Sequence, residues 1–203
     1  MPTDQAKYAL MSKAAYSMND NLKSKEDRMQ DAMGVLNDGG IQGFSMDTQE
    51  SNSKRAVFVN EATKQVVISH RGTDPTTAAN LTTDFAIALG LESMTRRYKN
   101  ATARDAATKE KYKGYNLHLT GHSLGGSIAT RSAVANNIPA SVYNPGSGLL
   151  NISHFLKPKK QGRVTNYTTL GDPLSLTSKL RPTEKVYVAQ KKGFNAHALA
   201  NFY

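Results

Sequence analysis

The spacing of apolar positions changes along the first 70 residues, and each change predicts a different kind of element. Apolar and small residues recur at helical spacing over 6–15 and again over about 26–36, and Gly39-Gly40 ends the second run. Residues 55–60 (RAVFVN) and 65–70 (QVVISH) are instead β-branched runs separated by EATK. This pattern predicts two helices followed by a β-hairpin.

The remainder of the chain alternates between helical and strand-like patterns. Residues 74–113 begin as a loop and then read as helix. Strands are predicted at 115–120, 140–143, 163–168 and 185–189, with helices at 124–136 and about 195–202. From residue 115 the order is strand, helix, strand, strand, which is typical of a largely parallel sheet covered by helices. We expect one α/β domain over residues 1–203, with a mixed, mostly parallel sheet flanked by helices.

The pattern G-x-S-x-G stands between a predicted strand and a predicted helix, in GHSLGG at 121–126. A strand-to-helix turn of this kind, a nucleophile elbow, raises its serine above the sheet in a strained backbone conformation. Gly121 and Gly125 avoid a collision across the turn. The sequence thus predicts Ser123 as a nucleophile and the Leu124 N–H as an oxyanion donor, whereas the plain alternative is a flexible glycine-rich turn.

The partners of the serine follow by elimination, because α/β-hydrolases order their triad as serine, acid, histidine. The acids after Ser123 are Asp172 and Glu184, and the histidines are His154 and His197. Since His154 precedes both acids, His197 is the predicted base. Asp172 directly follows a strand, whereas Glu184 precedes one at the wrong end of the sheet. Asp172 is therefore the predicted acid, although Asp-Pro is also a common turn and His197 could be a surface residue.

Several short motifs together resemble the class 3 lipases, also called fungal-type lipases, of the α/β-hydrolase superfamily. They are Ala14-Ala15-Tyr16, His70-Arg71-Gly72-Thr73, Asn80–Asp84, Gly121–Gly126, Tyr143–Ser147, Gly171-Asp172-Pro173 and His197–Tyr203. The resemblance implies that the Thr73 hydroxyl lines the oxyanion hole and that Asp84 is structural. It also implies a hydrolase of acylglycerols, phospholipids or other carboxylic esters that needs no metal and no other cofactor. A loop after an early strand supplies the second oxyanion donor in this fold, which independently supports Thr73.

The substrate contacts are predicted from the most apolar stretch between these motifs. Residues 85–94 (FAIALGLESM) are expected to line an acyl pocket or to form a mobile lid, and the alternative is a buried helix face. Phe85, Leu89 and Leu91 are the candidates for lipid contact. His122, inside the elbow, is added as a substrate-binding residue.

The positive charge of the chain is concentrated in its second part. The chain has 26 basic and 16 acidic residues. Residues 1–123 hold 16 of the basic and 14 of the acidic ones, whereas residues 124–203 hold 10 basic and only 2 acidic ones. Such a surface favours docking to an anionic membrane, with Lys157, Lys159, Lys160, Arg163, Lys191 and Lys192 as candidates. A merely solvated surface is the alternative. Basic and aromatic residues are not interleaved, which argues against nucleic acid as a partner.

Composition excludes some chemistry without fixing the compartment. The chain has no cysteine, which excludes disulfides, thiolate metal sites and a cysteine nucleophile. Met1-Pro2-Thr3-Asp4 does not resemble a signal peptide, and the apolar run 85–91 is too short to cross a bilayer. We expect a soluble protein whose localisation the sequence does not define.

The interpretation that these residues favour is a serine esterase or lipase acting through an acyl-enzyme. A phospholipase or acyltransferase with the same triad is an alternative, since water and another acceptor cannot be told apart from sequence. A catalytically inactive hydrolase fold that binds lipid or a protein is the alternative from a different class.

Overall fold

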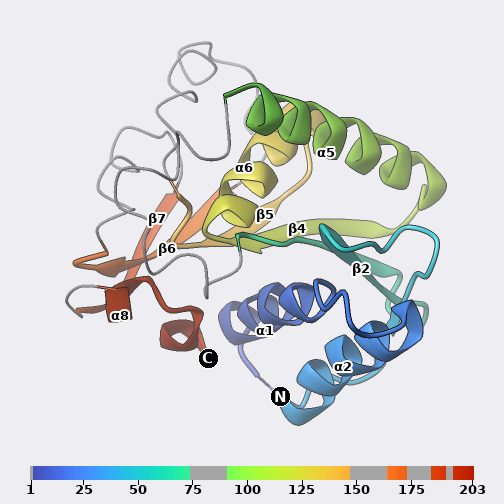
Figure 1. The fold of residues 1–203 in the computed structure, drawn as a ribbon, viewed down its shortest axis with the longest axis horizontal. Coiled ribbons are helices and arrows are strands. Elements are labelled where there is room, and N and C mark those ends of the chain that lie inside the picture. The colour runs from blue at the N-terminus through green and yellow to red at the C-terminus, as the bar shows by residue number, and fades with distance from the viewer. Residues whose placement is uncertain (1, 74–90, 147–163, 173–183, 191–193) are drawn as a thin grey trace.

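A single β-sheet runs through the protein, with helices on both of its faces (Figure 1). The computed structural model describes residues 2–73, 91–146, 164–172, 184–190 and 194–203. The helices within these residues are α1 (Asp4–Ser17), α2 (Lys25–Asp38), α5 (Leu91–Lys111), α6 (Leu124–Asn136), α8 (Phe194–His197) and the 3-10 helix η3 (Leu199–Phe202). The strands are β1 (Ser45–Met46), β2 (Arg55–Asn60), β3 (Gln65–His70), β4 (Asn116–His122), β5 (Ala140–Tyr143), β6 (Val164–Leu170) and β7 (Glu184–Gln190).

The strands lie side by side in chain order, from β1 to β7. β1, β2 and β3 pair antiparallel, whereas β3 to β7 pair parallel, so the mixed, mostly parallel sheet predicted from the sequence is confirmed. In register, His70 pairs with Gly121 and His122 pairs with Tyr143. The carboxyl ends of these strands therefore meet at one edge of the sheet, and the loops that follow them converge there.

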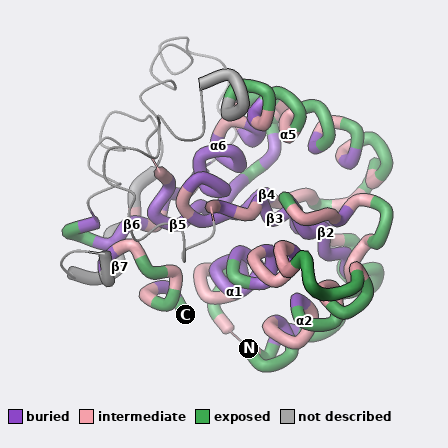
Figure 2. Tube along the Cα trace, viewed as in Figure 1, coloured by how far each residue is buried: buried purple, intermediate pink, exposed green. Residues whose placement is uncertain are grey.

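The two faces of the sheet carry different helices. α1 and α2 cover one face, and α5 and α6 cover the other (Figure 1). α1 begins because the Thr3 side chain accepts a hydrogen bond from the Ala6 amide, and Ser24 caps α2 through the Asp27 amide in the same way. The sides that face the sheet are buried, and the outer sides are exposed (Figure 2).

Two apolar clusters hold the layers together, one on each face. The first joins α1 and α2 to the sheet and includes Met11, Ala14 and Phe58, all fully buried. The second joins α6 to the sheet through Ile68, Leu119 and Ala129 among others. Small residues on α1 and α6 let these helices approach the sheet closely, which fixes the strand ends that carry the site.

The C-terminal end differs from the helix predicted over 195–202. Ala198 adopts an extended conformation (φ −63°, ψ 134°), which ends α8 at His197 before η3 begins. β1 was not predicted, because a strand of two residues is too short to show alternation. The other predicted strands and helices within the described residues are present, with ends that differ by at most two residues where a range was predicted.

Candidate active site

Ser123 occupies the turn between β4 and α6 in a conformation that side chains rarely adopt. Its backbone has φ 55° and ψ −127°. The turn is held on both sides, since the Ser123 N–H donates to the Tyr143 carbonyl (3.1 Å) and the Gly146 N–H donates to the Ser123 carbonyl (3.0 Å). Surrounding hydrogen bonds of this kind are what maintain a strained residue at a functional site.

The two glycines of the elbow are required by close backbone contacts. A Cβ atom on Gly121 would lie 2.5 Å from the backbone of Gly125, across the turn. A Cβ atom on Gly125 would overlap the carbonyl oxygen of His70 and lie 2.8 Å from the carbonyl carbon of Arg71. The predicted collision across the turn thus applies at Gly121, whereas Gly125 makes room for the end of β3.

Asp172 and His197, predicted as acid and base, are brought together. The His197 Nδ1 lies 3.1 Å from each Asp172 carboxylate oxygen. The Asp172 side chain is fully buried and the His197 side chain is 13% exposed. Because a carboxylate only accepts, Nδ1 carries a proton, and Nε2 is the nitrogen that can act as a base. Asp172 follows β6 and Ser123 follows β4, so both stand at the carboxyl edge of the sheet.

The contact between the serine and the histidine is open in this structure. Within the described ranges, no hydrogen bond joins the Ser123 hydroxyl to the His197 ring. Hydrogen bonds between catalytic groups are often long before a substrate binds. The neighbour of Ser123 does reach His197, because the rings of His122 and His197 lie 4.7 Å apart.

His122, predicted to contact substrate, is buried and bonded to protein at both ring nitrogens. Its Nε2 lies 2.8 Å from the His197 carbonyl oxygen, and its Nδ1 lies 3.0 Å from the Tyr16 hydroxyl. A carbonyl accepts only, so Nε2–H donates to His197 and Nδ1 accepts from Tyr16. Burial, together with the nearby His197, lowers the pKa of His122 to about 3. The ring is therefore neutral, and both of its nitrogens are bonded to protein groups, whereas its role in substrate binding stays a prediction.

Thr73 and Leu124, predicted as oxyanion donors, lie on the two segments that flank the serine. The Thr73 Oγ1 is buried and has no hydrogen-bond partner within the described residues. Leu124 is the first residue of α6, where helix N–H groups lack partners inside the helix. A Cβ atom on Gly72 would lie 2.8 Å from the His122 carbonyl oxygen, so the loop of Thr73 contacts the elbow directly.

A buried ionic cluster that the sequence reasoning missed lies under this loop. The Asp105 carboxylate, on α5, is fully buried and contacts His70 Nε2 (2.7 Å), Ser132 Oγ (2.6 Å) and Arg55 Nη1 (3.0 Å). Burial alone would raise the pKa of Asp105, but His70, Arg55 and the Ser132 hydroxyl lower it. One feature of the sequence could have indicated this cluster. It is His70, a polar residue at the end of an apolar strand, next to the segment that carries Thr73.

The remaining candidates lie outside the described residues. These are Phe85, Leu89, the structural Asp84, and the basic residues Lys157, Lys159, Lys160, Arg163, Lys191 and Lys192. Leu91 is the first residue of α5, but its side chain also lies outside the part of the structure that is described. In the described part of the chain, no group of three or more acidic or histidine side chains could hold a metal ion. None of the helices described there is long and apolar enough to cross a bilayer.

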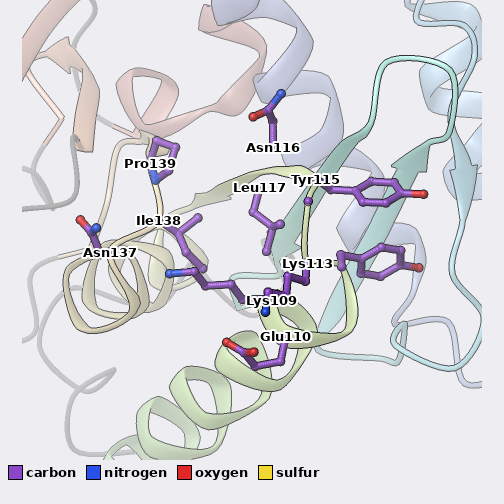
Figure 3. A pocket seen from close by; sticks show the side chains of 11 residues that line it. Lys109, Glu110, Lys113, Tyr115, Asn116, Leu117, Asn137, Ile138 and Pro139 are labelled. Carbon is purple, nitrogen blue, oxygen red and sulfur yellow. The ribbon is translucent and has the colours of Figure 1, made fainter.

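A separate pocket of about 480 Å³ lies at the opposite edge of the sheet (Figure 3). Its lining includes Lys109 of α5, Asn116 at the start of β4 and Pro139 just before β5. Ligands of open α/β sheets bind at the carboxyl ends of the strands. This pocket is at the amino ends, so it is distinct from the edge that carries Ser123.

Comparison with solved structures identifies the same fold in several lipases. Lipase II from Rhizopus niveus is 12% identical, with a TM-score of 0.59, 96% of this chain and 82% of that chain being covered. The nonglycosylated LIP2 lipase of Yarrowia lipolytica is 16% identical, with a TM-score of 0.57 over 91% of this chain and 78% of that one. A triacylglycerol lipase described as having a serine protease triad is 13% identical, with a TM-score of 0.62. The match covers 98% of this chain and 91% of that one.

Comparison of the sequence itself extends this result from fold to family. No curated protein matches the chain significantly. The sequence model of a phospholipase-like family, the Tle-like phospholipase domain, matches residues 7–201, which is nearly the whole chain. This chain therefore belongs to the Tle-like phospholipase domain family and is a carboxylic ester hydrolase of the lipase or esterase type with an α/β-hydrolase fold.

Proposed function

We propose that the protein hydrolyses ester bonds of phospholipids through an acyl-enzyme, with Ser123 as nucleophile, His197 as base and Asp172 as the orienting acid. The observation that carries this proposal is the Asp172–His197 pair, joined at 3.1 Å, at the same sheet edge as the strained Ser123. A solved lipase of this fold is described as having a serine protease triad. That description supports the same roles here.

In the proposed reaction, the Ser123 oxygen bonds to the ester carbonyl carbon while His197 Nε2 takes the hydroxyl proton. The tetrahedral intermediate then breaks its bond to the alcohol oxygen, which receives that proton and leaves. Water attacks the acyl-serine with His197 again as base, and the products are a carboxylic acid and the free enzyme. Asp172 keeps the imidazole in the required tautomer and stabilises its protonated form.

We place the oxyanion of the intermediate between the Leu124 N–H and the Thr73 segment. The buried Thr73 hydroxyl without a described partner supports this placement, because a buried polar group normally has a partner and a ligand oxygen would supply one. The Leu124 N–H is at the positive end of α6. Donors fixed in advance around a developing negative charge contribute several kcal/mol to catalysis, about 3–4 kcal/mol each.

The choice of phospholipid over neutral acylglycerol rests on positive charge beside the oxyanion loop. Arg97, on α5, donates from Nη2 to the Arg71 carbonyl (2.6 Å), two residues before Thr73. Burial and the charge of Arg71 lower the pKa of Arg97 to about 10, whereas Tyr98 and Tyr16 have smaller effects that raise it. Because its guanidinium contacts the residue that directly follows β3, we place the phosphate of a substrate beside Arg97.

The test compares variants at the two candidate acids. Wild type, Ser123→Ala, Asp172→Asn and Glu184→Gln are assayed on p-nitrophenyl esters of graded chain length and on phosphatidylcholine and phosphatidylglycerol vesicles. A fluorophosphonate probe reports reactivity of the serine. Glu184 is the control, since it begins β7 at the opposite edge.

We expect Ser123→Ala to lose labelling and hydrolysis, Asp172→Asn to lose about 10⁴-fold in kcat, and Glu184→Gln to keep wild-type rates. Hydrolysis retained by a folded Ser123→Ala variant would reject the proposed nucleophile. A wild-type protein that binds vesicles without hydrolysing any ester would instead support the inactive, lipid-binding alternative.

A further inference from the structure

We propose that Asn144 and His122 are positioning residues that fix the catalytic histidine by holding two consecutive backbone carbonyls, those of Ala196 and His197. The inference rests on the proposed role of His197 as base. It assigns a role to Asn144, which stands just after β5, and gives His122 a role different from substrate binding. Both side chains come from strand ends at the carboxyl edge of the sheet.

Asn144 joins the acid segment to the histidine segment with one amide. Its Oδ1 accepts from the Thr169 N–H (2.8 Å), three residues before Asp172, and its Nδ2 donates to the Ala196 carbonyl (2.8 Å), next to His197. An N–H can only donate and a carbonyl can only accept, so the orientation of the amide is unambiguous. A single side chain thus sets the spacing between the segments of acid and base.

The backbone of Asn144 supports a specific requirement for this side chain. The residue is fully buried and has φ 38°, in the left-handed region. Glycine adopts that conformation most easily, although asparagine tolerates it better than most residues. A buried amide must also be hydrogen-bonded to offset its desolvation. Asn144 meets both conditions only because its amide bridges two segments.

His122 holds the next carbonyl from the neighbouring strand. Its Nε2–H donates to the His197 carbonyl (2.8 Å), which fixes the tautomer, and the Tyr16 hydroxyl donates to the unprotonated Nδ1 (3.0 Å). The Tyr16 hydroxyl also touches Gly72 of the oxyanion loop. The His122 ring therefore connects His197 to Tyr16 of α1, and Tyr16 in turn contacts the loop that carries Thr73.

His197 needs such contacts because the helix that carries it, α8, is short. α8 has four residues and is followed by the extended Ala198, so few helical hydrogen bonds define the direction of the His197 side chain. Fixing two successive carbonyls restrains the two peptide planes that flank His197. The imidazole can then keep its Asp172 contact while Nε2 faces the serine, and an error of about 1 Å in such geometry can cost about 100-fold in rate.

The experiment removes one donor at a time while preserving shape. Asn144→Asp replaces the donating NH₂ group by an oxygen, and Asn116→Asp, at the exposed start of β4 on the opposite edge, is its control. His122→Gln retains an amide donor and His122→Phe retains only bulk. Tyr16→Phe removes the hydroxyl that donates to His122 Nδ1. Each variant is measured for kcat, KM, the pH profile of kcat/KM and unfolding temperature, on one p-nitrophenyl ester.

We expect Asn144→Asp and His122→Phe to lower kcat about 10- to 100-fold with KM within about twofold, and to shift the acidic limb of the pH profile. His122→Gln should recover part of the loss seen in His122→Phe, and Tyr16→Phe should fall between them and wild type. Asn116→Asp should match wild type.

The inference is overturned if the folded Asn144→Asp and His122→Phe proteins keep the wild-type kcat and pH profile. It is also overturned if His122→Gln and His122→Phe lose kcat equally. If Asn144→Asp does not fold, the His122 and Tyr16 variants still decide. A Ser123→Ala or His197→Gln variant with full activity would instead reject the proposed function itself, so the two failures are distinguishable.

Discussion

Gly125, in the first turn of α6, packs against the main-chain carbonyl of His70 at the end of β3. The elbow that carries Ser123 and the loop that carries Thr73 are thereby in direct backbone contact. In the proposed function these two residues are the nucleophile and an oxyanion donor, which have to be fixed relative to each other. The missing side chain of Gly125 makes this contact possible.

Gly125→Ala should therefore damage both stability and activity. The added methyl group would overlap main-chain atoms of β3 that cannot rotate away, which costs about 1–3 kcal/mol or more of unfolding free energy. We expect hydrolysis to fall at least about 100-fold as the loop of Thr73 moves. Urea denaturation and ester hydrolysis measure the two effects.

Gly34→Ala is the matched control, because a Cβ atom at Gly34 of α2 has no neighbour within 4 Å. It should stabilise the protein by about 0.5–1 kcal/mol and leave kcat unchanged. Full activity of Gly125→Ala would contradict the requirement for this contact.

Much of the architecture was predictable because its signals are local. The runs at 55–60 and 65–70 and the elbow helix at 124–136 coincide with observed elements. The meeting of Asp172 and His197 was predictable from chain order together with the place of Asp172 after a strand, since few acids and histidines follow Ser123. Patterns of spacing and order are carried within short segments, so they can be read without coordinates.

The hydrogen-bond network around the site was not predictable, because it joins residues far apart in the chain. Nothing in the segment around Asn144 indicates that its amide contacts both Thr169 and Ala196. The contacts of His122 were not predictable for the same reason, since its partners Tyr16 and His197 come from opposite ends of the chain. A motif identifies the residue, but the fold decides what that residue contacts.

The buried cluster under the oxyanion loop gives a second prediction. Asp105→Asn removes the negative charge between Arg55 and His70, leaving the Arg55 guanidinium buried with less compensation. We expect a loss of about 3 kcal/mol in unfolding free energy, measured in urea, and slower hydrolysis because His70 precedes the loop of Thr73. Glu61→Gln, which breaks an exposed pair with Lys64, should change neither. Equal stability of both variants would contradict a supporting role for the cluster.

Arg97 should affect substrates according to their charge. Arg97→Gln is expected to lower kcat/KM on phosphatidylglycerol about 10- to 100-fold, the value of a charge-assisted hydrogen bond, with a neutral p-nitrophenyl ester changed less than about twofold. Arg97→Lys should recover part of the loss. Arg104→Gln, on the exposed side of the same helix, is the control for overall charge. Equal losses on both substrates would mean that Arg97 supports the loop rather than recognising phosphate.

Two histidines, the buried His122 and the partly buried His118, should make stability depend on pH. Burial, with a smaller effect of Lys7, lowers the pKa of His118 to about 4, and burial with His197 lowers that of His122 to about 3. The His118 ring stacks on Tyr8 at 3.9 Å, and its Nε2 lies 3.1 Å from the Ser141 hydroxyl. Both rings are neutral in the folded protein at pH values where an unfolded chain binds protons, below about 6.5.

The sign of the effect follows from proton binding. Above about pH 7 neither state binds these protons, so the two histidines do not affect stability there. Between about 6.5 and 4 the unfolded chain binds more protons, and stability falls with decreasing pH by up to about 1.4 kcal/mol per pH unit for each histidine. Carboxylates add to this loss below about pH 5. The measurement is urea denaturation at intervals from pH 7.5 to 4.5. The free energy of unfolding should show this slope in wild type and about half of it in His118→Gln. Parallel curves of free energy against pH for the two proteins would contradict the assignment to His118.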